Sequence, residues 1–209
     1  MFLGVATPRF ILQFLLEHLW LVGVACGIAF PLALILGIWV TRPASREGHV
    51  ARYVTQFVFL GQAVPSLAVI GLVMAVLGTG EATAIFALTI YSLVPMVRNV
   101  VEGLRSVDTS VLDAAKGIGM APLGVLVRVE LPLALPVIFA GLRTAVVITI
   151  GTAALSSQVG GGGLGRMIFT GLSMMDTGLI LSGAVPTALL AIFADKALGL
   201  VERRLRGDW

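Results

Sequence analysis

The chain has 209 residues, of which 58% are hydrophobic and only 12% are charged. Soluble domains carry about 25% charged residues, so this composition excludes an ordinary water-exposed surface and predicts one integral membrane domain over residues 1–209. The net charge of +3 does not indicate a nucleic-acid partner, because the basic residues lie between apolar runs, where they report membrane topology. The one cysteine, Cys26, excludes an internal disulfide and is expected to be a small packing residue.

Five apolar stretches are candidates for membrane-spanning helices, each of which needs about 20 mostly apolar residues. Residues 8–18 are expected to form a short interfacial helix before the first of them. The runs are continuous rather than alternating, so they predict helices and not a barrel. The fold class is therefore all-α, with five or at most six spanning helices. The five stretches are 19–40, 54–77, 82–97, 133–155 and 178–200.

The distribution of Lys and Arg predicts the orientation in the membrane. If the loop between the third and fourth spans is cytoplasmic, 12 of the 14 basic residues lie on that side, and only Arg9 and Arg166 lie outside. The positive-inside rule then places the N-terminus outside and the C-terminus in the cytoplasm. The central parts of the spans carry no ionisable residue, which opposes a proton-coupled transporter. Arg143 is expected to extend its side chain toward the cytoplasmic surface.

Each expected span contains one proline. Pro136 is expected in the first turn of its helix, where a missing N–H costs little, whereas the other prolines should kink their helices or free a carbonyl. The five are Pro31, Pro65, Pro95, Pro136 and Pro186.

Small residues recur at four-residue spacing in the first span, a pattern that lets helix backbones approach closely. They are predicted to pack either inside the subunit or against a second one. The residues are Gly23, Gly27, Ala33 and Gly37.

Residues 108–132 form a polar, glycine-containing segment between the third and fourth spans. Ser110 is expected to cap a short helix that begins just after it, and Gly119 to help end that helix. Pro122 suits the first position of a second short helix over 123–130, which leads into the fourth span. The sequence therefore predicts a helix–turn–helix at the membrane surface.

This segment carries an acidic residue, two alanines, a glycine four positions later and a final Leu-Pro. The spacing resembles the EAA loop of ABC-importer permeases, with Asp in place of the usual Glu. In that family the loop is the cytoplasmic segment that docks on an ATPase subunit. The resemblance implies that residues 108–132, here named the coupling loop, contact a partner ATPase. The residues that match the motif are Asp113, Ala114, Ala115, Gly119, Leu131 and Pro132.

Other segments resemble the permeases of osmoprotectant importers, and together they cover residues 18–204. The resemblance implies the methionine-importer-like permease fold and uptake of glycine betaine, choline or carnitine across the bacterial cytoplasmic (inner) membrane. It also implies a cytoplasmic ATPase, a second identical or homologous permease and an extracytoplasmic substrate-binding protein. The segments are 61–67, 91–99, 116–120, 129–133, 136–144 and 162–165.

The chain offers no catalytic residues, metal ligands or cofactor site of its own. No G-x-x-x-x-G-K-[ST] motif occurs, so ATP is expected to be hydrolysed by the partner, and the chain is a transport subunit rather than an enzyme. His18 and His49 each lack a spaced metal partner and are expected at the membrane interfaces.

Two groups of residues are candidates for roles in transport. Four polar or proline positions in the spans are candidates for the lining of the translocation path. Helix kinks and interhelical hydrogen bonds explain the same residues equally well. The four are Gln62, Pro65, Ser66 and Pro95. A glycine run formally satisfies a dinucleotide motif but follows a membrane helix instead of a strand. It is expected to be a flexible external loop that acts as a gate, formed by Gly160, Gly161, Gly162 and Gly163.

Two alternatives remain from the sequence. The first is an ABC permease for another small solute, such as an amino acid. The second is a channel or secondary transporter that works without ATP, which the coupling loop and the uncharged span centres oppose. The few Trp and Tyr residues are scattered, so selective binding of a cationic head group is expected on a separate receptor.

Overall fold

The computed structural model describes residues 8–42 and 64–206, and every regular element in these two ranges is helical. Four helical segments are long and apolar enough to cross a membrane: Arg9–Thr41, Glu81–Arg105, Pro122–Val159 and Thr177–Leu205. The helices are α1 (Pro8–Thr41), α4 (Ser66–Leu77), α5 (Glu81–Arg105), α6 (Thr109–Gly117), α7 (Pro122–Val125), α8 (Leu131–Leu155), α9 (Gly165–Met174) and α10 (Thr177–Arg206). A π turn, η1 (Leu126–Glu130), joins α7 to α8, and a 3-10 turn, η2 (Ser156–Val159), follows α8.

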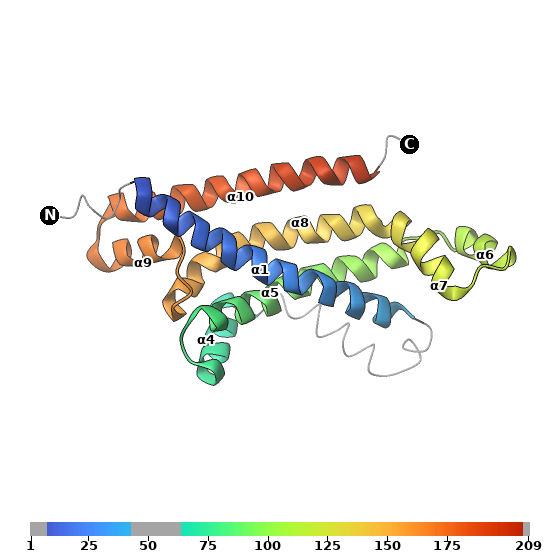
Figure 1. Cartoon of the computed structure of the whole chain (residues 1–209), viewed down its shortest axis with the longest axis horizontal. Coiled ribbons are helices and arrows are strands. Elements are labelled where there is room, and N and C mark those ends of the chain that lie inside the picture. Colours follow the sequence, from blue (N-terminus) through green and yellow to red (C-terminus); the bar gives the residue numbers. More distant parts are fainter. Residues whose placement is uncertain (1–7, 43–63, 207–209) are drawn as a thin grey trace.

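The four long helices α1, α5, α8 and α10 run along the long axis of the molecule (Figure 1). Helix α5 packs against both α1 and α8, while α10 packs against α8 and α9. Helices α6 and α7 lie at one end of this bundle, and α4 and α9 lie at the other (Figure 1). The main core includes Cys26, which is buried as predicted for a packing residue.

The N-terminal helix differs from the prediction of a short interfacial helix followed by a separate span. Helix α1 runs without a break from Pro8 to Thr41. The expected break was at Glu17 and His18, but both polar side chains are accommodated inside the protein. The Nε2 atom of His18 donates to the carbonyl of Ile150 at 2.9 Å, and the ring is fully buried. His18 is thus buried within the subunit, its depth in the membrane stays a prediction, and His49 lies outside the described residues.

The boundaries of the next two expected spans also changed. Helix α4 begins at Ser66, so Pro65 precedes this helix instead of kinking its middle; residues 54–63 lie outside the described part. Helix α5 continues past the expected end of the third span to Arg105. Arg98 and Glu102, one turn apart on α5, form an ion pair at 2.8 Å, which is compatible with a helix that extends beyond its apolar part.

The fourth span begins earlier than expected. Because α7, η1 and α8 form one continuous helical segment, Pro136 lies inside it and not in a first turn. The prediction for Pro136 was wrong because it treated the Leu131-Pro132 step as the start of the helix. Pro31, Pro95 and Pro186 lie inside their helices, as expected.

The small residues of α1 divide into two groups. A side chain at Gly37 would overlap Val100 of α5, so this glycine is required for close approach of the two helices. Ala33 is also completely buried. Gly23 and Gly27, in contrast, have no neighbouring atoms that a side chain would meet within the described subunit. Packing inside the subunit therefore explains the second half of the pattern only.

Candidate functional site

The coupling loop begins with a capped helix, although the capping residue is not the predicted one. Asp108 is the N-cap of α6, and its Oδ1 atom accepts a hydrogen bond from the backbone N–H of Ser110 at 2.8 Å. This backbone hydrogen bond lowers the pKa of the Asp108 carboxyl because it favours the charged form. Ser110 thus donates from its backbone to the cap instead of serving as the cap.

The end of α6 confirms the predicted role of Gly119. The N–H of Met120 donates to the carbonyl of Ala115 at 3.2 Å, and the N–H of Gly119 donates to that of Lys116 at 2.9 Å. These two bonds define a Schellman motif, which needs a residue with positive φ. Gly119 supplies it with a φ of 84°. The turn that orients α6 therefore depends on a glycine at this position.

The second part of the coupling loop is continuous with the membrane helix. Pro122 occupies the start of α7, as predicted. The predicted separate helix over 123–130 is not formed, because α7 passes through η1 directly into α8. Pro132 has no N–H to bond the carbonyl of Arg128, and just before it the N–H of Leu131 bonds the carbonyl of Leu126 in a π pattern. The Leu-Pro step therefore accompanies a π turn at the base of the loop.

The surface of the coupling loop is partly apolar. Ile118 and Leu123 are 81% and 70% exposed, and Ala114 is also exposed. Asp113 forms an exposed ion pair with Lys116 at 3.2 Å. Ala115 is buried within the loop, so its small side chain contributes to local packing, and its contact with a partner ATPase stays a prediction. Ala114, Ile118 and Leu123 are among the exposed residues of the loop that a partner can contact.

At the opposite end of the bundle, Gly161, Gly162 and Gly163 of the glycine run are buried, and Gly160 is exposed. Gly160, Gly162 and Gly163 have positive φ values of 88°, 79° and 70°. The N–H of Gly163 donates to Oε2 of Glu17 at 3.0 Å, and an added side chain at Gly163 would contact His18. The sequence predicts a flexible loop, whereas the structure shows these glycines in one conformation packed against α1. The role of this segment as a gate stays a prediction.

Three of the four candidate path residues are described by the structure, at the start of α4 and within α5. Pro65 is exposed just before α4, and Ser66 begins that helix. Pro95 is buried within α5, where its carbonyl accepts a hydrogen bond from the Asn99 side chain at 2.9 Å. This environment favours the packing explanation for Pro95. Gln62 lies outside the described residues.

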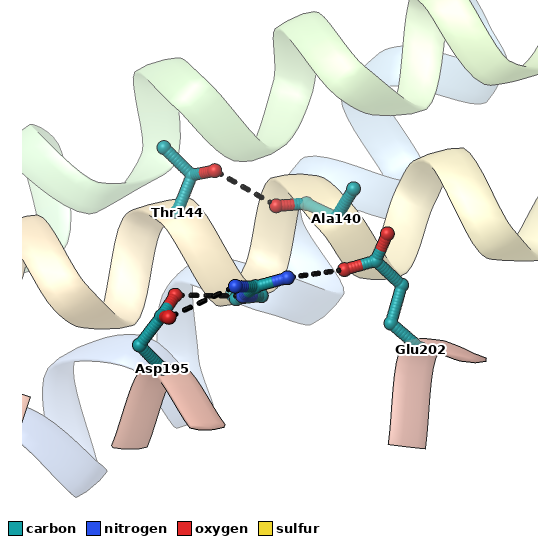
Figure 2. Close-up of polar contacts among 5 residues, drawn as sticks. Ala140, Thr144, Asp195 and Glu202 are labelled. Atoms are coloured by element: carbon teal, nitrogen blue, oxygen red, sulfur yellow. Dashed lines mark hydrogen bonds and ion pairs between the residues drawn. The ribbon is translucent and has the colours of Figure 1, made fainter. Parts of the chain in front are cut away.

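An ion cluster between α8 and α10 was missed at the sequence level. Arg143 donates to both carboxylate oxygens of Asp195, at 2.7 and 2.9 Å, and to Glu202 at 3.0 Å. Figure 2 shows the two carboxylates on either side of the guanidinium group, on the α10 face toward α8. Gly199 lies between the two acids, and an added side chain there would contact the guanidinium. Arg143 is therefore held by ion pairs to α10, which the sequence analysis did not predict.

The spacing of residues along α10 is a sequence signal for this ion cluster. Asp195, Gly199 and Glu202 follow one another at spacings of four and three, which places them on one face of a helix. Two acids on one face of a mostly apolar helix require a cation from a neighbouring helix.

Comparison with known proteins defines the class of this helical membrane protein. Residues 29–207 match the family model described as the inner membrane component of binding-protein-dependent transport systems, and the chain belongs to this family. The fold is also that of a solved inward-facing methionine ABC transporter, MetNI, with a TM-score of 0.84. That match has 21% identity and covers 98% of this chain and 99% of the other. The predicted all-α, methionine-importer-like fold is thus confirmed, and the number of spans stays a prediction.

Two curated relatives are more similar in sequence. The carnitine transport permease OpuCD of Listeria monocytogenes is 40% identical, with 92% of this chain and 87% of the relative covered. The glycine betaine/carnitine/choline permease OpuCB of Bacillus subtilis is also 40% identical, over 90% of this chain and 85% of the relative. These relatives support the resemblance on which the sequence interpretation relied.

Proposed function

We propose that this chain is the membrane permease subunit of an ATP-driven importer for osmoprotectants such as glycine betaine, choline or carnitine. The observation that carries the proposal is the coupling loop, with its capped α6 and exposed Ala114, Ile118 and Leu123, in a chain 40% identical to permeases named for these solutes. A partner ATPase binds the loop and hydrolyses ATP, and a second permease completes the pore. A binding protein delivers solute at the outer face. An amino-acid solute is the second candidate, supported only by the shared fold with the methionine transporter.

The transport prediction is tested with the complete complex in proteoliposomes. ATP should drive accumulation of labelled glycine betaine, choline or carnitine when the ATPase and the binding protein are present. Accumulation of methionine and none of these three would contradict the solute assignment.

In the same assay, Ala114→Trp should weaken ATPase association about 5- to 150-fold, because overpacking an interface costs about 1–3 kcal/mol. Ile35→Trp on the exposed face of α1 is the matched control. Unchanged ATPase binding and uptake in Ala114→Trp would contradict docking at this loop.

The proposed orientation places the N-terminus outside and the coupling loop and C-terminus in the cytoplasm. Its support is that Arg98, Arg105, Lys116, Arg128, Arg203 and Arg204 all lie on α5, the coupling loop or the last turns of α10. The C-terminal ends of α5 and α10 lie on the same side of the bundle as α6 and α7 (Figure 1). This end carries most of the basic charge, as the cytoplasmic end of a membrane protein does.

Cysteine labelling in intact cells measures this orientation. In a Cys26→Ala background, Ser173→Cys on α9 should react with a membrane-impermeant reagent. Ser110→Cys on α6 should react only after a membrane-permeant reagent is used. Both positions are exposed, so accessibility within the subunit does not limit the reaction. The reverse labelling pattern would overturn the orientation.

A further inference from the structure

The base of the coupling loop is tied to the end of α1 by an ion pair. Arg42 follows α1 directly, and its Nη2 and Nη1 atoms donate to Oε2 and Oε1 of Glu130 at 2.5 and 3.3 Å. The Arg42 side chain is 32% exposed and that of Glu130 only 13%. A two-point contact between a guanidinium and a carboxylate fixes direction as well as distance. The pair therefore sets the orientation of two elements that are 88 residues apart in the chain.

The ion pair lies where the backbone hydrogen bonds of the helix constrain its direction least. Glu130 is the last residue of η1, directly before Leu131 and Pro132. The regular α-helical hydrogen bonds are interrupted here, because Pro132 cannot donate and Leu131 bonds in a π pattern. A helix with an interrupted ladder bends more easily than a regular one. An external contact at this point therefore has a large influence on where the loop lies.

Apolar packing beside the ion pair joins the same elements. The cluster at this end of the bundle contains side chains from α1, α5, the coupling loop and α8. It is formed by Val100, Leu104, Val107, Ala134 and Ile138, with Phe30, Leu34, Ile38, Leu112, Leu126 and Leu131 packed against it. Apolar contacts are non-directional, so they hold the loop near α1 without fixing its angle. The directional contact is the one between Arg42 and Glu130.

We infer that Arg42 and Glu130 are positioning residues that hold the coupling loop at a fixed angle to α1, so that movement of a docked ATPase reaches α1 as well as α5 and α8. The inference rests on the proposed function of the loop. Neutralising Arg42 leaves a largely buried carboxylate without its cation and frees the loop to change its angle. ATP hydrolysis then continues with less solute moved per ATP. Reversing both charges restores the pair and with it the angle.

The test combines a distance measurement with a coupling measurement on the complete transporter. Spin labels at Ile35→Cys on α1 and Ser110→Cys on α6, in a Cys26→Ala background, report the position of the loop; both residues are exposed. Arg42→Gln should broaden the label-to-label distance distribution and raise the number of ATP molecules hydrolysed per solute severalfold. The double variant Arg42→Glu with Glu130→Arg should reverse both effects. Arg204→Gln, which removes an exposed cation from the end of α10, should change neither.

The outcomes separate this inference from the proposed function. An unchanged distance distribution in Arg42→Gln would overturn the positioning role. A changed distribution with unchanged ATP per solute would show that the pair orients the loop without affecting transport, and would also overturn the inference. Absence of ATP-driven uptake in the unmodified complex would contradict the proposed function instead, while the distance measurement would still decide whether the pair fixes the loop.

Discussion

Replacing Gly165 with alanine should prevent most of the protein from folding. A side chain at this position would overlap the carbonyl oxygen, carbonyl carbon and Cα of Ala154, all of them backbone atoms. Backbone cannot rotate out of the way as a flexible side chain can, so the cost should reach or exceed the upper part of the range for overpacking, about 3 kcal/mol. The expected result is a large loss of monodisperse protein in detergent and a lower thermal unfolding midpoint for what remains.

Gly151 provides a matched control in the same part of the molecule. It lies in α8, three residues before Ala154, and a side chain there would meet nothing within 4 Å. Gly151→Ala should leave the yield and the unfolding midpoint unchanged or slightly raised, because alanine favours helix over glycine by about 1 kcal/mol. Equal yields of the Gly165→Ala and Gly151→Ala proteins would contradict the close contact between the end of α8 and the start of α9.

Removal of the Arg143 side chain should have the second large effect. Arg143→Met takes the shared cation away from Asp195 and Glu202, both of which lie on an otherwise mostly apolar helix. Loss of the guanidinium removes the ion pairs that connect α8 to both carboxylates of α10, and breaking an ion pair with a buried partner, here Glu202, is strongly destabilising. Helix α10 should then separate from α8 more easily. We expect a strong fall in the yield of folded protein and in its thermal midpoint.

A compensated variant distinguishes lost charge balance from lost packing. Combining Arg143→Met with Asp195→Asn and Glu202→Gln removes the uncompensated charge and should recover most of the yield. Arg203→Gln, an exposed residue next to Glu202, is the control for loss of a cation at this end of α10. If the triple variant is as poor as Arg143→Met alone, packing of the arginine side chain and not its charge is the main contribution.

The parts of the structure that could be predicted from sequence are those set by neighbouring residues. Long apolar runs define spanning helices because the membrane interior requires them to be continuous. Gly119 and Pro122 mark a helix end and a helix start because their backbone preferences act within one turn. The motif from Asp113 to Pro132 covers helical elements between α5 and the start of α8, and its docking role stays a prediction.

The parts that could not be predicted depend on contacts between distant residues. Gly163 bonds Glu17 across 146 residues, and His18 bonds Ile150 across 132. Neighbouring residues alone indicate a flexible glycine run and a histidine without a partner in the protein. The distant partners, Glu17 and Ile150, show that both segments are held in place. The same holds for Arg143 and Asp195, which are 52 residues apart. Burial of Ala115 likewise follows from how α6 contacts α7 and η1, which no spacing in the sequence records.

The π turn at Leu126–Glu130 affects the direction in which the coupling loop leaves α8, measured as rotation around the helix axis. A π turn holds one residue more than an α-helical turn, and successive residues of a regular helix are about 100° apart around its axis. The extra residue therefore rotates α7, and with it α6, by about 100° around the axis of α8 compared with an unbroken α-helix. Deletion or insertion of one residue between Leu126 and Glu130 would rotate α6 and α7 around the axis of α8, although the sequence of those two helices would not change.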